Sequence, residues 1–193
     1  MTLRYDSRSR VSTYTQSWVS GFDPDFGVYE SIAGTVVVGA GGASTLTFSS
    51  IPQTYKHLQI RSMARNSADN ISLRMTFNSD SSSIYTLHEL YGSGTAAAYA
   101  SQANIAYYPC ALVGPASATG VFGISVTDIM DYQITDKFKT MRTLTGYDAN
   151  GSGYVELTSG VWRSNSAITS MTIVPNGGNI SQYSHFALYG IKG

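Results

Sequence analysis

The stretch ISLRMTFN, residues 71–78, indicates the fold class more clearly than any other part of the chain. Its apolar residues Ile71, Leu73, Met75 and Phe77 alternate with polar ones. Successive side chains of a β-strand point to opposite faces of a sheet, so this period of two predicts a strand with one buried and one solvated face.

Similar stretches recur along the chain on both sides of this one. Further strands are expected in YKHLQIRSMAR (55–65), IYTLHELYG (84–92), TGVFGISVTDIMDY (119–132), FKTMRTLTGYD (138–148), GYVELTSGVWR (153–163), AITSMTIVP (167–175) and SHFALYGIKG (184–193). In the stretch 119–132, Phe122, Ile124, Val126 and Met130 share one face. The clusters SDSSS (79–83), DANGSG (148–153) and NGGN (176–179) predict turns between strands.

Two segments need a separate interpretation. The runs TVVV (35–38) and STLTFS (44–49) flank the turn sequence GAGG (39–42), which predicts a β-hairpin. The Ala-rich stretch TAAAYASQANIAYYP (95–109) has some helical propensity. We expect it to form a long connection with a helical turn.

Nine or ten short strands with regular turns and no amphipathic helix predict an all-β protein. The expected architecture is an antiparallel β-sandwich of jelly-roll type over residues 34–193. We expect the last strand to lie between two partners, because a chain end stays ordered only where the fold pairs with it.

Residues 1–33 have a different composition and predict an extended N-terminal arm. They combine three arginines with aromatic residues at uneven spacing that fits neither a helix nor a strand, and GFDPDFG (21–27) predicts a bend. An arm of this kind either orders against another protein or lies along its own domain. The candidate partner-binding residues are Arg4, Arg8, Arg10, Tyr14, Trp18, Phe22 and Phe26.

Charge and composition exclude several classes of function. Only 12% of the 193 residues are charged, about half the share in an average protein, and twelve acidic residues balance twelve basic ones. Nucleic acid is therefore not an expected partner. A protein without net charge lacks the self-repulsion that opposes association, so we expect a homo-oligomer, with a trimer favoured. The start MTLRYDSRSR lacks the apolar core of a signal peptide, and no apolar run is long enough for a transmembrane helix, so we expect no membrane association.

No residue pattern predicts catalysis, a cofactor or a metal site. The three histidines, His57, His88 and His185, lie in predicted strands and fit local hydrogen bonding better than catalysis. The single cysteine, Cys110, belongs to no motif.

Two acidic patterns in the sequence have structural explanations. The carboxylates Asp128, Asp131, Asp136 and Glu156 could suggest a glycosidase pair, but residues 128 and 131 point to opposite faces of an extended strand. DANGSGYVE (148–156) resembles a calcium loop, yet position twelve is Ser159 rather than Glu, so a β-turn is favoured.

The tyrosines leave two alternatives open. Aromatic side chains with a hydroxyl group can stack on sugars, and they are also enriched at protein interfaces. The interface is the favoured interpretation and a glycan-binding face the alternative. The residues concerned are Tyr85, Tyr91, Tyr99, Tyr107, Tyr108 and Tyr132.

Taken in order, seven motifs resemble a group of tailed-bacteriophage virion proteins. These are SIPQTYKHLQIR (50–61), LRMTFNSD (73–80), LHELYG (87–92), FGISVTDIMDY (122–132), FKTMRTLTGYD (138–148), GVW (160–162) and YSHFALYGIKG (183–193). The resemblance covers about residues 28–193, and the first 27 residues lie outside it.

The resemblance implies a structural virion protein without enzymatic activity, made in the host cytoplasm and located in the particle. The leading expectation is a capsid decoration (cement) protein that binds the major capsid protein or another virion protein through its arm. A tail, baseplate or fibre component that recognises host surface glycans is the alternative.

Overall fold

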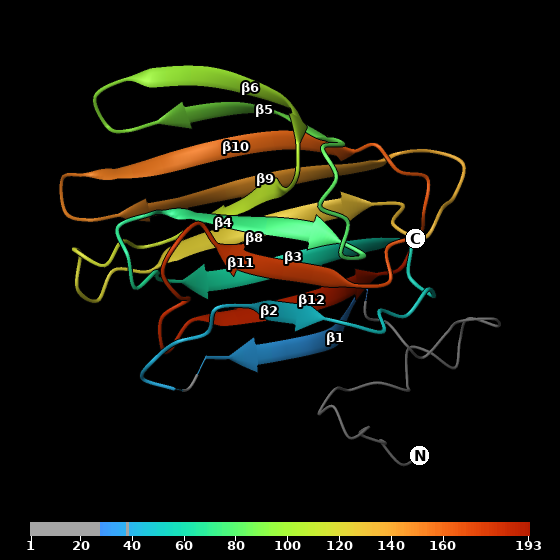
Figure 1. Ribbon diagram of the computed structural model, residues 1–193, viewed down its shortest axis with the longest axis horizontal. Helices are drawn as coiled ribbons and strands as arrows, with labels where there is room; N and C mark the ends of the chain where they lie inside the picture. Colours follow the sequence, from blue (N-terminus) through green and yellow to red (C-terminus); the bar gives the residue numbers. More distant parts are fainter. Residues whose placement is uncertain (1–27, 38) are drawn as a thin grey trace, which may run out of the picture.

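The computed structural model describes residues 28–37 and 39–193, and this part of the chain is an all-β protein with twelve strands and no helix (Figure 1). The strands are β1 (Tyr29–Val36), β2 (Leu46–Phe48), β3 (His57–Ala64), β4 (Ser72–Phe77), β5 (Tyr85–Gly92), β6 (Ala97–Ile105), β7 (Tyr108–Leu112), β8 (Gly123–Met130), β9 (Lys139–Asp148), β10 (Gly153–Trp162), β11 (Met171–Pro175) and β12 (His185–Ile191). All strand pairs of the two sheets are antiparallel.

The strands form two packed sheets, and this confirms the antiparallel sandwich of jelly-roll type predicted from the sequence. The large sheet has eight strands in the order β1-β12-β3-β8-β9-β10-β5-β6, and the small sheet has four in the order β2-β11-β4-β7. The last strand, β12, lies between β1 and β3, as expected. Phe186 and Leu188 of β12 point into the core.

The core lies between the two sheets and follows the predicted alternation. Leu73, Met75 and Phe77 of β4 are fully buried, while the polar residues between them are half-buried. Trp162 and Tyr85 pack beside Phe77, with ring centroids 5.4 Å and 6.1 Å from its own. Gly190 of β12 leaves room for the ring of Tyr55, which a Cβ atom at residue 190 would meet at 2.3 Å.

Two local predictions are wrong because pairing in a sandwich is dominated by residues distant in sequence. The runs around GAGG do not form a hairpin: β1 pairs with β12 in the large sheet, whereas β2 pairs with β11 in the small one. The Ala-rich stretch contains the strand β6 rather than a helical turn, because β5 offers it a complete pairing edge.

Strand β1 begins at Tyr29, so strand pairing starts within the last residues of the N-terminal arm predicted over residues 1–33. The sequence NGGN does form a turn, with Gly177 and Gly178 at positive φ, but it connects strands of different sheets.

The small sheet covers only part of the large one. In Figure 1 it lies in front of β12, β3 and β8, while β10, β5 and β6 extend beyond it. Because the small sheet does not cover this part of the large sheet, both of its faces are accessible to solvent, and the candidate sites lie there. The described part of the chain contains no helix that is long and apolar enough to cross a membrane.

Candidate interaction surfaces

The central strands of the large sheet place hydroxyl side chains against the core. On β8 and β9 the buried residues include Ser125, Thr127, Thr143 and Thr145, which lie beside the buried apolar Ile129 and Met141. Antiparallel sheets with one solvated face usually bury their apolar side chains and expose the polar ones. Strands β8 and β9 show the opposite arrangement at these positions.

Thr127, Thr143 and Thr145 are hydrogen-bonded to β7, whereas the hydroxyl of Ser125 lies 2.7 Å from that of Ser62 on β3. Tyr108 donates to Oγ1 of Thr143 at 3.0 Å, the hydroxyls of Thr143 and Thr127 lie 2.8 Å apart, and Thr127 donates to the carbonyl of Cys110 at 3.1 Å. If Thr143 donates to Thr127, the hydroxyls of Tyr108, Thr143 and Thr127 each donate one hydrogen bond in this series. Strand β7 is therefore held to the large sheet by polar contacts at these positions, and aliphatic side chains are not needed there.

The outer face of the same strands carries the aliphatic side chains. Strand register places Val126, Leu144, Leu157, Leu90 and Tyr99 in one row across β8, β9, β10, β5 and β6. A second row holds Ile124 and Val155, with Gly146 between them. We define the apolar band as Leu90, Tyr99, Ile124, Val126, Leu144, Val155 and Leu157. Its members are between 38% and 87% exposed.

The apolar band has a hollow at one end and a polar border along one side. The hollow has a volume of about 920 Å³ and is lined by Phe122, Ile124, Val126, Leu144 and Val155, together with the loop at residues 92–94. The next row of the outer face is polar: Asp128, Arg142, Ser159, His88 and Ser101. Large exposed apolar patches with a polar rim are typical of protein-binding sites.

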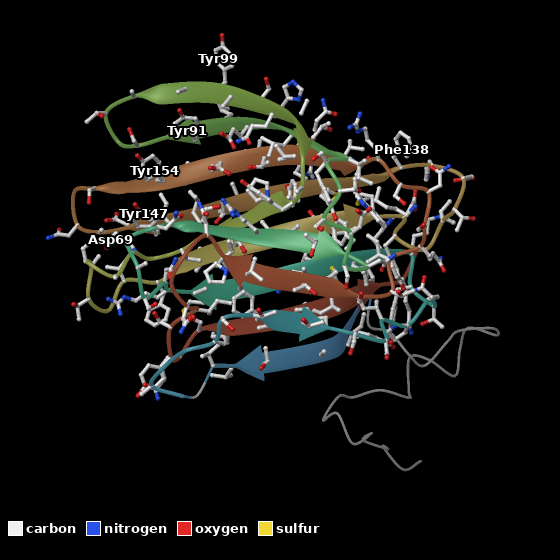
Figure 2. The ribbon with its side chains drawn as sticks, in the orientation of Figure 1. Asp69, Tyr91, Tyr99, Phe138, Tyr147 and Tyr154 are labelled. Atoms are coloured by element: carbon white, nitrogen blue, oxygen red, sulfur yellow. The ribbon has the colours of Figure 1, made fainter. Side chains whose placement is uncertain are left out.

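A second candidate site lies on the inner face, where the small sheet no longer covers the large one. Tyr147 and Tyr154 are cross-strand partners with ring centroids 6.0 Å apart, and Tyr91 lies diagonally across from Tyr154 (Figure 2). A cavity of about 580 Å³ adjoins the first two and is also lined by Asp69, Ser117 and Ser152. Burial raises the pKa of Tyr147. We refer to this site as the tyrosine cleft.

The tyrosine face predicted from the sequence is not a single surface. Tyr85, Tyr108 and Tyr132 are buried, Tyr99 belongs to the apolar band, and Tyr107 lies under the guanidinium of Arg74 at 4.2 Å. Of the six predicted residues, only Tyr91 belongs to the tyrosine cleft. The prediction missed Tyr147 and Tyr154, although the turn DANGSG between them indicated a hairpin that would pair them.

The predicted arm residues lie outside the described part of the chain. These are Arg4, Arg8, Arg10, Tyr14, Trp18, Phe22 and Phe26.

The carboxylates do not form a catalytic pair among the described residues. Asp128 lies on the outer face and accepts a hydrogen bond from Gln59 at 2.8 Å, whereas Glu156 lies on the inner face and accepts one from Thr158 at 2.6 Å. Asp131 and Asp136 lie beyond the end of β8. The two strand carboxylates thus face opposite sides of the sheet.

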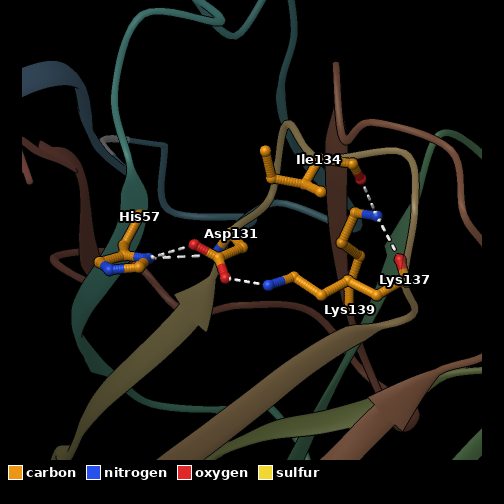
Figure 3. Close-up of polar contacts among 5 residues, drawn as sticks. All are labelled: His57, Asp131, Ile134, Lys137 and Lys139. Atoms are coloured by element: carbon orange, nitrogen blue, oxygen red, sulfur yellow. Dashed lines mark hydrogen bonds and ion pairs between the residues drawn. The ribbon is translucent and has the colours of Figure 1, made fainter.

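The loop between β8 and β9 is organised by His57, Asp131 and two lysines (Figure 3). Nδ1 of His57 accepts the backbone N–H of Asp131 at 3.0 Å, and Lys137 holds the Asp131 carboxylate, which lowers its pKa. Lys139 is fully buried and donates to the carbonyls of Ile134 and Lys137. Burial lowers the pKa of Lys139. These contacts fix the loop, and they give His57 the local role expected of it.

The calcium-like sequence forms the β9–β10 turn. The Asp148 carboxylate accepts the backbone N–H of Asn150 at 2.8 Å, and Asn150 and Gly151 have positive φ. Within residues 28–37 and 39–193, no group of three His, Cys, Asp or Glu side chains is arranged to hold a metal ion.

Comparisons with known proteins give a fold likeness only. The sequence matches no protein-family model and no curated protein sequence. Among solved structures, the chain is similar to the galectin LEC-6 of Caenorhabditis elegans, with 6% identity, a TM-score of 0.33, and 83% of this chain and 96% of that chain covered. It is also similar to a fructofuranosidase from Schwanniomyces occidentalis, with 8% identity, a TM-score of 0.29, and 89% of this chain but 35% of that chain covered.

Proposed function

We propose that this chain is a structural protein of a tailed-bacteriophage virion, acting as a capsid decoration (cement) protein. The observation that carries the proposal is the apolar band, which turns aliphatic side chains to solvent, while on β8 and β9 four Ser and Thr residues take core-facing positions. A protein that acted alone in water would gain stability from the reverse arrangement. The arrangement therefore favours a partner that covers the outer face.

The partner we propose is the major capsid protein or another coat protein with an apolar surface. The apolar band contains no charged side chain, and the chain has no net charge, so long-range electrostatic attraction does not select the partner. Repetition over a symmetric shell multiplies modest contacts by avidity. The N-terminal residues 1–27, rich in aromatic side chains, would provide a second contact.

Particle composition and binding test this proposal. Purified virions should contain hundreds of copies of the chain, measured by quantitative mass spectrometry against the major capsid protein. The full chain should co-sediment with capsids assembled without it, and a variant lacking residues 1–27 should fold but bind more weakly. A few copies per particle, or no binding of the full chain, would reject the decoration role, whereas equal binding of both proteins would reject the contact by residues 1–27.

The tyrosine cleft supports a second candidate function, recognition of host glycans by a tail or fibre component. Tyr147 and Tyr154, beside a carboxylate and two serines, offer stacking surfaces and hydrogen-bonding groups of the kind that bind sugars. A glycan array distinguishes the two candidates. Binding that Tyr154→Ala abolishes would favour the tail component, while a blank array leaves the coat-protein role as the proposal.

A further inference from the structure

The large sheet ends in a strand without the usual protection against pairing. Strand β6 is outermost and, among the described residues, pairs only with β5. Its nine residues, AAYASQANI, include no charged residue and no proline. Natural edge strands are usually blunted by charges, prolines, bulges or short length, because an open edge accepts another strand.

The other three sheet edges are blunted. Strand β1 contains Glu30, which is ion-paired with Lys192 at 2.9 Å, and has an irregular register after Ser31. Strand β2 has three residues, and β7 contains Pro109 beside a register shift. The irregularity in the β5–β6 pairing lies near the end of β6, so Ala97–Gln102 is regular. The open edge is therefore specific to β6.

We propose that β6 pairs with β6 of a second copy of this chain, antiparallel about a two-fold axis near Ser101. In this register Ser101 faces its own copy, Tyr99 faces Ala103, and Ala100 faces Gln102. These pairs bring no like charges together, and small side chains allow close approach. A two-fold contact uses the same surface on both copies and closes on itself, which limits growth to a dimer.

The apolar band supports the same pairing. Tyr99, at the end of the band, is 87% exposed and lies on β6. Because the two-fold axis is perpendicular to the sheet, the outer faces of both copies lie on the same side, and each exposed Tyr99 would pack beside Ala103 of the other copy. The pairing would give a dimer rather than the trimer favoured from the sequence. It does not depend on the virion role, since it requires only this chain.

Charge-swap variants at Ser101 test the pairing. Ser101 is exposed on the outer face, so Ser101→Lys and Ser101→Glu should fold normally, as checked by circular dichroism. Sedimentation equilibrium of the full-length chain should show a dimer for the original protein and at least a tenfold higher dissociation constant for each variant alone. An equimolar mixture of the two variants should restore the dimer, because opposite charges then face each other.

Ser159→Lys is the matched control, since Ser159 is exposed on the same face but lies on the interior strand β10. It should leave the dimer unchanged. A monomeric original protein would overturn the proposal, as would a Ser101→Lys dimer of undiminished affinity. Two monomeric variants that fail to associate on mixing would also overturn it, because β6 would then contact a different surface.

Discussion

Replacing Leu144 by Ser separates the two contributions of the apolar band, to folding and to binding. Full burial of a leucine side chain is worth about 1.5–3 kcal/mol relative to exposure. Leu144 is 59% exposed, so about 0.9–1.8 kcal/mol remains for a partner and about 0.6–1.2 kcal/mol already stabilises the fold. Leu144→Ser should therefore weaken binding to capsids about 5- to 20-fold while lowering stability only modestly.

Two measurements on the same protein check this division. Urea denaturation should show a loss near 1 kcal/mol in the free energy of unfolding, and co-sedimentation with capsids assembled without the chain should give the loss of affinity. Thr140→Ser is the matched control, because Thr140 is exposed on the same strand outside the apolar band. Unchanged affinity of Leu144→Ser would refute the docking role, and a stability loss above about 3 kcal/mol would show that Leu144 acts as a core residue.

Three further predictions concern the fold that supports these surfaces. Thr143→Val should lower the free energy of unfolding by about 1–3 kcal/mol, because the buried Tyr108 hydroxyl loses its nearest acceptor; a variant as stable as the original protein in urea would contradict this. Glu89→Gln should stabilise the protein at pH 7 but not below about pH 4, since burial and the nearby Glu156 raise the pKa of Glu89 and its ionisation then opposes folding as pH rises. Thermal melts across this range test it, and a variant that gains nothing at pH 7 would refute it. Deleting residues 184–193 should prevent folding, because β12 pairs on both sides and buries Phe186 and Leu188; a native circular dichroism spectrum would reject the prediction.

The strands could be predicted from sequence wherever their inward residues are aliphatic. The alternation in ISLRMTFN gave β4 with its buried residues, and the terminal strand was predicted between two partners. Prediction failed for β6, where an Ala-rich sequence with helical propensity becomes a strand by pairing with β5. Local propensity could not reveal this, because the deciding contacts come from a neighbouring strand.

The apolar band was not predicted, although the residues that share a face were grouped correctly on β8. Alternation shows that Ile124, Val126 and Met130 lie together, but it does not show which face is buried when the other face carries Ser125 and Thr127 beside Ile129. Which face is buried depends in part on β7, whose Cys110 carbonyl and Tyr108 hydroxyl bind the inward hydroxyls of Thr127 and Thr143. That contact joins strands of different sheets and has no signature in the local sequence.

The hydroxyl-lined core and the apolar exterior are therefore one feature of the fold. Once Thr127, Thr143 and Thr145 are bound to β7, this part of the large sheet is anchored by directional hydrogen bonds, and the aliphatic residues Ile124, Val126 and Leu144 face outward. Such a sheet keeps its shape without the partner, because its core contacts do not involve the apolar band. Binding then adds apolar contacts to a surface that is already ordered, which lowers the entropic cost of assembly. This combination is what the decoration role that we propose would require, since such a component folds alone before it is added to a shell.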